Sequence, residues 1–173
     1  MKPLIVLITA FTISFVIIKM YSGKWKKIPA GNIAMASMLL FTATGHFLYN
    51  RGMALMLPDF IPSKQAIVLF TGLLEIAAAI GLLIPKLRSL TGFLLIIFFF
   101  MILPANIYAA VKNLDYEKAA YTGTGVGYLW FRIPLLLFFI VWVFYFSKPS
   151  YNGRGEKSSH LDYRATANTS LYR

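Results

Sequence analysis

The chain has 173 residues, of which 58% are hydrophobic and only 13% are charged. A soluble domain of this size has about a quarter charged residues, so the composition excludes an ordinary soluble protein. The length allows one bundle of about four or five membrane-spanning helices at roughly 20 residues each. The sequence therefore predicts an all-α, polytopic membrane helix bundle with little chain left for a soluble catalytic domain.

The formal net charge is +11, from 17 Lys and Arg residues against 6 Asp and Glu residues. The basic residues lie at the ends of apolar runs, where a membrane explains them better than nucleic acid does. We therefore expect the lipid bilayer as a partner and no nucleic acid.

The chain contains no cysteine, which excludes disulfides, thiol exchange, iron-sulfur clusters and thiolate metal sites. Only two histidines occur, and His160 lies in the polar C-terminal segment, so one copy cannot hold a haem between two histidines inside the bundle. We expect no metal site and no covalently bound cofactor. Any redox role would then need a redox centre in another molecule.

Five apolar runs are long enough to cross a bilayer, namely residues 4–20, 33–49, 65–84, 90–111 and 129–146. Lipid offers the backbone no hydrogen-bond partner, so each run is expected to be a helix. The second run is the weakest, because Thr42, Thr44, Gly45 and His46 interrupt it. The first run ends in lysines without a small-residue cleavage site, which favours an uncleaved helix.

The predicted organisation has three parts. Residues 1–27 form an extra N-terminal transmembrane helix and a basic loop, residues 28–146 form a four-helix membrane module, and residues 147–173 form a flexible basic cytoplasmic tail. Lys and Arg accumulate on the cytoplasmic side of membrane proteins, and five helices divide the 17 basic residues into eleven and six. Four helices, without the second run, would divide them into nine and eight. Five helices with the N-terminus outside and the C-terminus in the cytoplasm are therefore favoured.

The connection of residues 50–63 should lie on the outer side of the membrane. It carries Met53, Met56 and other apolar residues, and Pro58 and Pro62 exclude a long regular helix. We expect it to lie in the interface as a lid over the mouth of the bundle.

Ionisable and polar side chains inside apolar runs usually face a cavity or a partner. Glu75 lies halfway along the third run, and Arg132 is the cation expected to pair with it. His46 and Asn106 fall in the same outer half, so four spans each contribute one polar residue. The sequence predicts an outward-facing polar pocket, formed by Glu75, Arg132, Asn106 and His46, for a small polar or quinone-like head group.

Each of these residues also has a purely structural interpretation. Glu75 lies beside small residues that permit close helix packing, so it could be a hydrogen-bonded link between helices. Asn106 could satisfy the carbonyl that Pro104 leaves without a partner. His46 could be a solvated interfacial histidine and Arg132 an interfacial anchor.

Four blocks of sequence resemble the DoxX-like membrane proteins in order and spacing. They are GHFLYNRGMALMLPDFIPS, TGLLEIAAAIGLLIPKLRSLTG, LPANIYAAVKN and LWFRIPLLLFFIVW, and the resemblance covers about residues 31–146. It implies a four-helix module in the bacterial inner membrane with both module ends facing the cytoplasm. His46, Glu75, Asn106 and Arg132 match recurring polar positions of that family.

The resemblance also implies a redox association, because one branch of the family is similar to the small subunit of a thiosulfate:quinone oxidoreductase. The first hypothesis is therefore a redox-associated subunit, itself non-catalytic or handling only protons, that binds quinone while a redox partner protein handles electrons. The second is a non-catalytic membrane scaffold for partner proteins. The third is a small-solute or proton transporter, disfavoured by the short chain and the lack of paired broken helices.

Overall fold

The computed structural model describes residues 2–123 and 125–148, and these residues form helices and connections without a strand. Five helices in these ranges are long and apolar enough to cross a membrane. They are α1 (Lys2–Ser22), α2 (Lys27–Leu48), α4 (Lys64–Leu83), α5 (Arg88–Val111) and α6 (Leu129–Phe146), with the short α3 (Asn50–Ala54) and a 3-10 turn η1 (Gly125–Tyr128) between them. The predicted all-α bundle with five spanning helices is confirmed, and the protein is a multi-pass membrane protein. The predicted tail lies outside the described residues from residue 149 onward.

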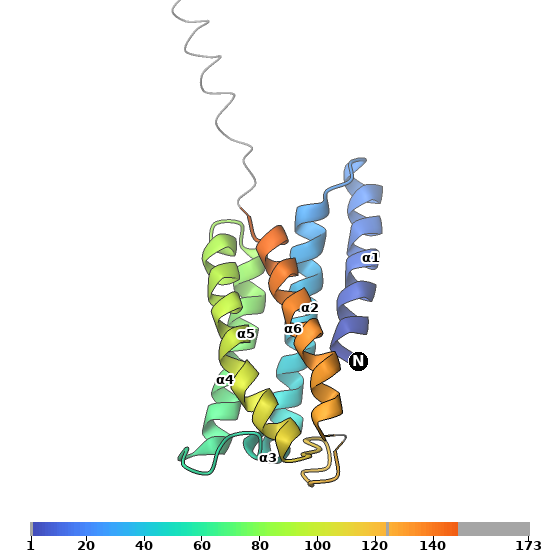
Figure 1. The fold of residues 1–173 in the computed structure, drawn as a ribbon. Helices are drawn as coiled ribbons and strands as arrows, with labels where there is room; N and C mark the ends of the chain where they lie inside the picture. The colour runs from blue at the N-terminus through green and yellow to red at the C-terminus, as the bar shows by residue number, and fades with distance from the viewer. Residues whose placement is uncertain (1, 124, 149–173) are drawn as a thin grey trace, which may run out of the picture.

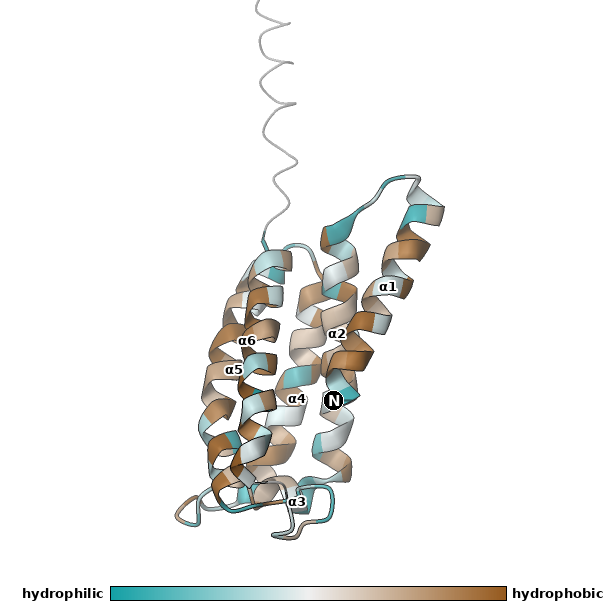
Figure 2. Cartoon of the chain, turned by 45° about the vertical axis from the view of Figure 1, so that its right-hand side comes forward, coloured by the Kyte–Doolittle hydropathy of each residue, from teal (hydrophilic) through white to brown (hydrophobic). Residues whose placement is uncertain are grey.

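The axes of the long helices are roughly aligned, and α1 lies at one edge of the bundle beside α2 (Figure 1). Hydrophilic residues gather in the connections at both ends, whereas the helices are mainly hydrophobic (Figure 2). One end carries α3 and residues 112–123 and 125–128, and we call it the cavity end. The opposite end carries the turns between α1 and α2 and between α4 and α5.

The helix α2 occupies the centre of the bundle and packs against α1, α4 and α6. Half of the most hydrophobic stretch of α2 (50%) is buried inside the protein, whereas 11% of the corresponding stretch of α1 is buried. Thr42 and His46, which weaken the second apolar run, line a cavity inside the bundle. The helix begins at Lys27, earlier than the sequence predicted, because Pro29 is tolerated in a first helical turn. Lys27 thus belongs to α2 and not to the preceding loop.

At the opposite end, hydrogen bonds join α2 to the end of α6. Asn32 Nδ2 donates to the carbonyl of Phe146 at 2.8 Å, and Trp142 Nε1 donates to the carbonyl of Gly31 at 3.1 Å. The ring of Phe146 lies so close to Gly31 that a Cβ there would overlap it. These contacts fix α2 against α6 at this end, while at the other end the same two helices line a cavity.

Replacing Asn32 by Ala should lower the free energy of unfolding by about 1 kcal/mol, because the buried link to α6 is lost. The matched control is Thr9→Ala, since the Thr9 hydroxyl bonds only carbonyls of its own helix, those of Ile5 and Val6. Unfolding in detergent micelles titrated with sodium dodecyl sulfate measures both variants. Equal stability of the two variants would show that the link to α6 contributes nothing.

Candidate functional site

A cavity of about 310 Å³ lies at the cavity end, between α2, α4, α5 and α6. Its deeper walls are apolar and aromatic, formed by Met38, Phe41, Phe98, Phe99, Leu135, Leu136 and Phe139. Its polar lining comprises Thr42, His46, Tyr49, Thr71, Glu75, Asn106, Tyr116 and Arg132. A hydrophobic wall with a few convergent polar groups is typical of small-molecule sites.

The structure brings all four sequence-predicted residues to this one cavity, each from a different spanning helix. His46 comes from α2, Glu75 from α4, Asn106 from α5 and Arg132 from α6. Glu75 and Asn106 are almost fully buried, with 5% and 3% of their surface exposed. His46 and Arg132 are half-buried. None of the four therefore projects into the lipid as an isolated polar group.

The partner of Glu75 differs from the one expected. His46 Nε2 lies 3.6 Å from Glu75 Oε1, whereas no Lys or Arg of the described ranges comes within 4.0 Å of this carboxyl group. The sequence predicted Arg132 as the partner of Glu75, whereas in the structure His46 is the ionisable residue beside this carboxyl group. One reason is that α2 packs directly against α4, and Gly72 brings the two helices close at this level.

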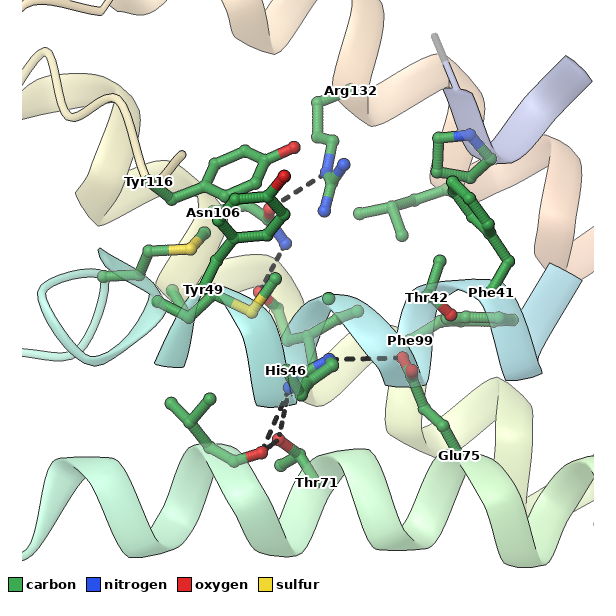
Figure 3. Close-up of a pocket in the computed structure, with 18 of the residues that line it drawn as sticks. Phe41, Thr42, His46, Tyr49, Thr71, Glu75, Phe99, Asn106, Tyr116 and Arg132 are labelled. Carbon is green, nitrogen blue, oxygen red and sulfur yellow. Dashed lines mark hydrogen bonds and ion pairs between the residues drawn. The ribbon is translucent and has the colours of Figure 1, made fainter. Parts of the chain in front are cut away.

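The ring of His46 is held by the neighbouring turn of α4. His46 Nδ1 lies 3.1 Å from both the carbonyl of Val68 and the hydroxyl of Thr71, and that hydroxyl itself donates to the same carbonyl at 2.8 Å. A carbonyl can only accept, so this geometry assigns a proton to Nδ1. The other ring nitrogen, Nε2, therefore faces Glu75 (Figure 3).

The second oxygen of the Glu75 carboxyl group has no protein partner. Oε2 is buried, and within the described part of the chain no donor or acceptor lies at hydrogen-bond distance from it. Buried polar atoms are nearly always hydrogen-bonded, because leaving one without a partner costs about 1–3 kcal/mol. Glu75 lines the cavity, so a ligand there could supply the missing partner.

Arg132 belongs to a separate polar group on the other side of the cavity (Figure 3). Its Nε donates to Asn106 Oδ1 at 2.9 Å, and its Nη1 donates to the Tyr128 hydroxyl at 3.2 Å. No Asp or Glu of residues 2–123 and 125–148 lies within 4.0 Å of its guanidinium group. Arg132 thus presents a cation without a protein counter-charge to the cavity.

Asn106 orients the arginine. Its Nδ2 donates to the carbonyl of Ile102 at 2.8 Å, so its Oδ1 must point toward Arg132. The carbonyl that Pro104 leaves without its helical donor is that of Phe100, four residues before the proline. The structural interpretation of Asn106 as the partner of that carbonyl therefore does not hold.

The family model described as a domain of unknown function (DUF8561) matches residues 35–147, more than half of the chain. The chain belongs to this family. The matched residues contain α3 to α6 and most of α2, and thus all four predicted site residues. No curated protein and no solved structure matches the chain.

In this DUF8561 protein, the mouth of the cavity is closed by segments that are distant in sequence. Met53 and Met56 of the predicted lid line it, together with Tyr116 and with Lys2 at the start of α1. Gly52 allows α3 to approach the backbone of Tyr116, since a Cβ at that position would overlap its carbonyl. The sequence thus predicted that residues 50–63 cover the mouth of the cavity. It did not predict that Tyr116 and Lys2 also line this mouth.

The missed residues lie at the start of α1 and in the second connection. Lys2 Nζ forms an ion pair with Glu117 Oε1 at 2.8 Å and joins α1 to that connection. Burial raises the pKa of the Tyr116 phenol, so its hydroxyl stays neutral at the mouth. Tyrosines in this connection, such as Tyr116 and Tyr121, are typical of a membrane interface and do not by themselves indicate a wall of a pocket.

Replacing Gly72 by Ala should separate α4 from α2 at the level of the site, because the added Cβ would come 2.8 Å from His46 Cβ. Overpacking of this kind costs about 1–3 kcal/mol, so the melting temperature in detergent should fall by several degrees. Gly127→Ala is the matched control, since its Cβ would meet nothing within 4 Å. If both variants melted like the wild type, the close packing of α2 on α4 would be contradicted.

Proposed function

We propose that this protein binds the head group of a quinone-class ligand in the cavity between α2, α4, α5 and α6. The observation that carries the proposal is a mainly apolar, membrane-embedded cavity that contains two separate polar groups without full protein partners, Glu75 and Arg132. Its volume of about 310 Å³ lies at the lower end of the range of ligand pockets, about 300–1,000 Å³. A compact ring suits such a space better than a large cofactor does.

The lining matches the two parts of such a ligand. Phe41, Phe99 and Phe139 offer aromatic faces for a flat ring and its apolar substituents. Arg132 still has N–H groups that can donate to a ring oxygen, since Asn106 and Tyr128 occupy only two of its five. A flat, amphipathic head group satisfies both requirements.

The proposal extends to location and partner. The resemblance to DoxX-like proteins and the distribution of basic residues support a bacterial cytoplasmic membrane with the cavity end facing outward. The chain has no cysteine for thiol redox chemistry, so a partner protein would exchange electrons with the ligand. The protein itself would hold the head group as a subunit of a redox complex.

A membrane scaffold is the second candidate, because one observation favours it. The contacts of His46 with Glu75, Thr71 and Val68 link α2 to α4, as expected for polar groups that only specify helix packing. In that case the cavity would bind no ligand. A substitution that fills the cavity and leaves these contacts in place separates the two functions.

Replacing Thr42 by Phe should fill part of the cavity and weaken the binding of a short-chain benzoquinone at least tenfold. Thr42 lines the cavity, and its hydroxyl bonds only the carbonyls of Met38 and Leu39 in its own helix. The control is Thr12→Phe, which adds the same ring on the exposed surface of α1, where the Thr12 hydroxyl likewise bonds its own helix.

Calorimetric titration of the purified proteins in detergent micelles measures the affinities. Loss of binding in Thr42→Phe but not in Thr12→Phe supports the ligand site. An absence of saturable binding to the wild type, or equal affinity in all three proteins, would contradict it and leave the scaffold as the better account.

A further inference from the structure

We propose that this site selects the reduced, hydroxyl-bearing form of its ligand, a hydroquinone or phenol, over the oxidised quinone. The inference rests on the proposed function and adds which chemical form the cavity holds. It follows from the hydrogen-bonding character of the two polar ends of the cavity. One end, at Glu75, offers an acceptor oxygen, and the other, at Arg132, has donors only.

The acceptor character of Glu75 Oε2 follows from the geometry around His46. With Nδ1 donating toward Val68 and Thr71, Nε2 faces Glu75 Oε1 at 3.6 Å, and a proton on one of these two atoms prevents two acceptors from facing each other. If that proton is on Nε2, Glu75 is a carboxylate and both of its oxygens accept. If it is on the carboxyl group, it belongs on Oε1, which faces the bare Nε2. In both arrangements Oε2 offers lone pairs to the cavity.

Thr42 reinforces this end as an acceptor. Its hydroxyl lies 3.2 and 3.0 Å from the carbonyls of Met38 and Leu39 in its own helix, and donation to either one leaves its lone pairs available to a ligand. Glu75 and Thr42 thus both offer lone pairs to a donor in the cavity. Within the described residues Oε2 has none, which makes a ligand hydroxyl the missing partner.

The opposite end needs an oxygen that accepts. Arg132 has donors only, and the oxygen of Asn106 beside it already accepts from Arg132 Nε. A hydroquinone meets both requirements, because each ring hydroxyl can donate and can accept. A quinone meets only the requirement at Arg132, since its carbonyl oxygen would face Glu75 Oε2, acceptor against acceptor.

A quinone could accept a hydrogen bond in the same position only if Glu75 carried a proton on Oε2. Without a further proton, this arrangement would leave His46 Nε2 facing Oε1 with no proton between them. A site built around a hydroxyl group rejects an analogue that lacks it, because the polar atom of the site is left without its partner. We therefore expect at least tenfold tighter binding of the hydroxyl-bearing form.

A pair of redox-inactive probes tests this preference directly. The probes are a 4-alkylphenol and its methyl ether, which share the ring and the chain but differ in the single hydroxyl proton. Calorimetric titration of the wild-type protein should show at least tenfold tighter binding of the phenol. A short-chain benzoquinol should likewise bind more tightly than the corresponding benzoquinone when both affinities are measured without oxygen.

The variant Glu75→Gln should remove the preference, because an amide can turn its NH₂ group toward the cavity and donate to the ether or quinone oxygen. The affinities of this variant for the phenol and for the ether should then differ by no more than about threefold. Arg132→Gln is the control, because it should weaken the benzoquinol, which has an oxygen for each end of the cavity, and leave the preference for the phenol over its ether in place.

The outcomes separate the inference from the function on which it rests. A preference for the phenol that Glu75→Gln abolishes supports both. If the wild type binds phenol and ether equally tightly and Thr42→Phe weakens both, the ligand site stands and the selectivity is wrong. If neither probe nor the benzoquinone binds, the proposed function fails and the selectivity fails with it.

Discussion

The structure depends on one buried carboxyl group and the histidine that faces it. Glu75 lies in the middle of α4, almost fully buried, and His46 on α2 is its nearest ionisable neighbour. An ionisable group at that depth is tolerated only where protein, a partner or a cavity surrounds it. The contact between α2 and α4, with Gly72 allowing the close approach, therefore shapes the wall of the cavity as well as the bundle.

The two ends of the bundle have different packing. Asn32 and Trp142 join α2 to α6 by hydrogen bonds at the opposite end, beside the close contact of Phe146 with Gly31. At the cavity end the same helices line a space, and α3 with the second connection covers it. The bundle thus combines tight packing of α2 on α6 at one end with a cavity between the same helices at the other.

The sequence was sufficient to predict the spanning helices and the gathering of four polar side chains, because lipid enforces helices and penalises isolated polar groups. It could not predict that Glu75 faces His46 and not Arg132, since this depends on which helix faces are in contact. The second run is the least hydrophobic of the five spans, as the sequence indicated, and half of it is buried inside the protein in α2. The role of Lys2 at the mouth depends on an ion pair across 115 positions of sequence, for which no local signal exists.

The central claim is that Glu75 Oε2 receives a hydrogen bond from a ligand hydroxyl inside the cavity. Infrared difference spectroscopy of the protein with and without a 4-alkylphenol measures the carboxyl group itself. The account predicts that the phenol shifts a carboxyl or carboxylate band, and that this band is missing from the difference spectrum of Glu75→Gln. A spectrum of the phenol-bound wild type in which no band depends on Glu75 would contradict it.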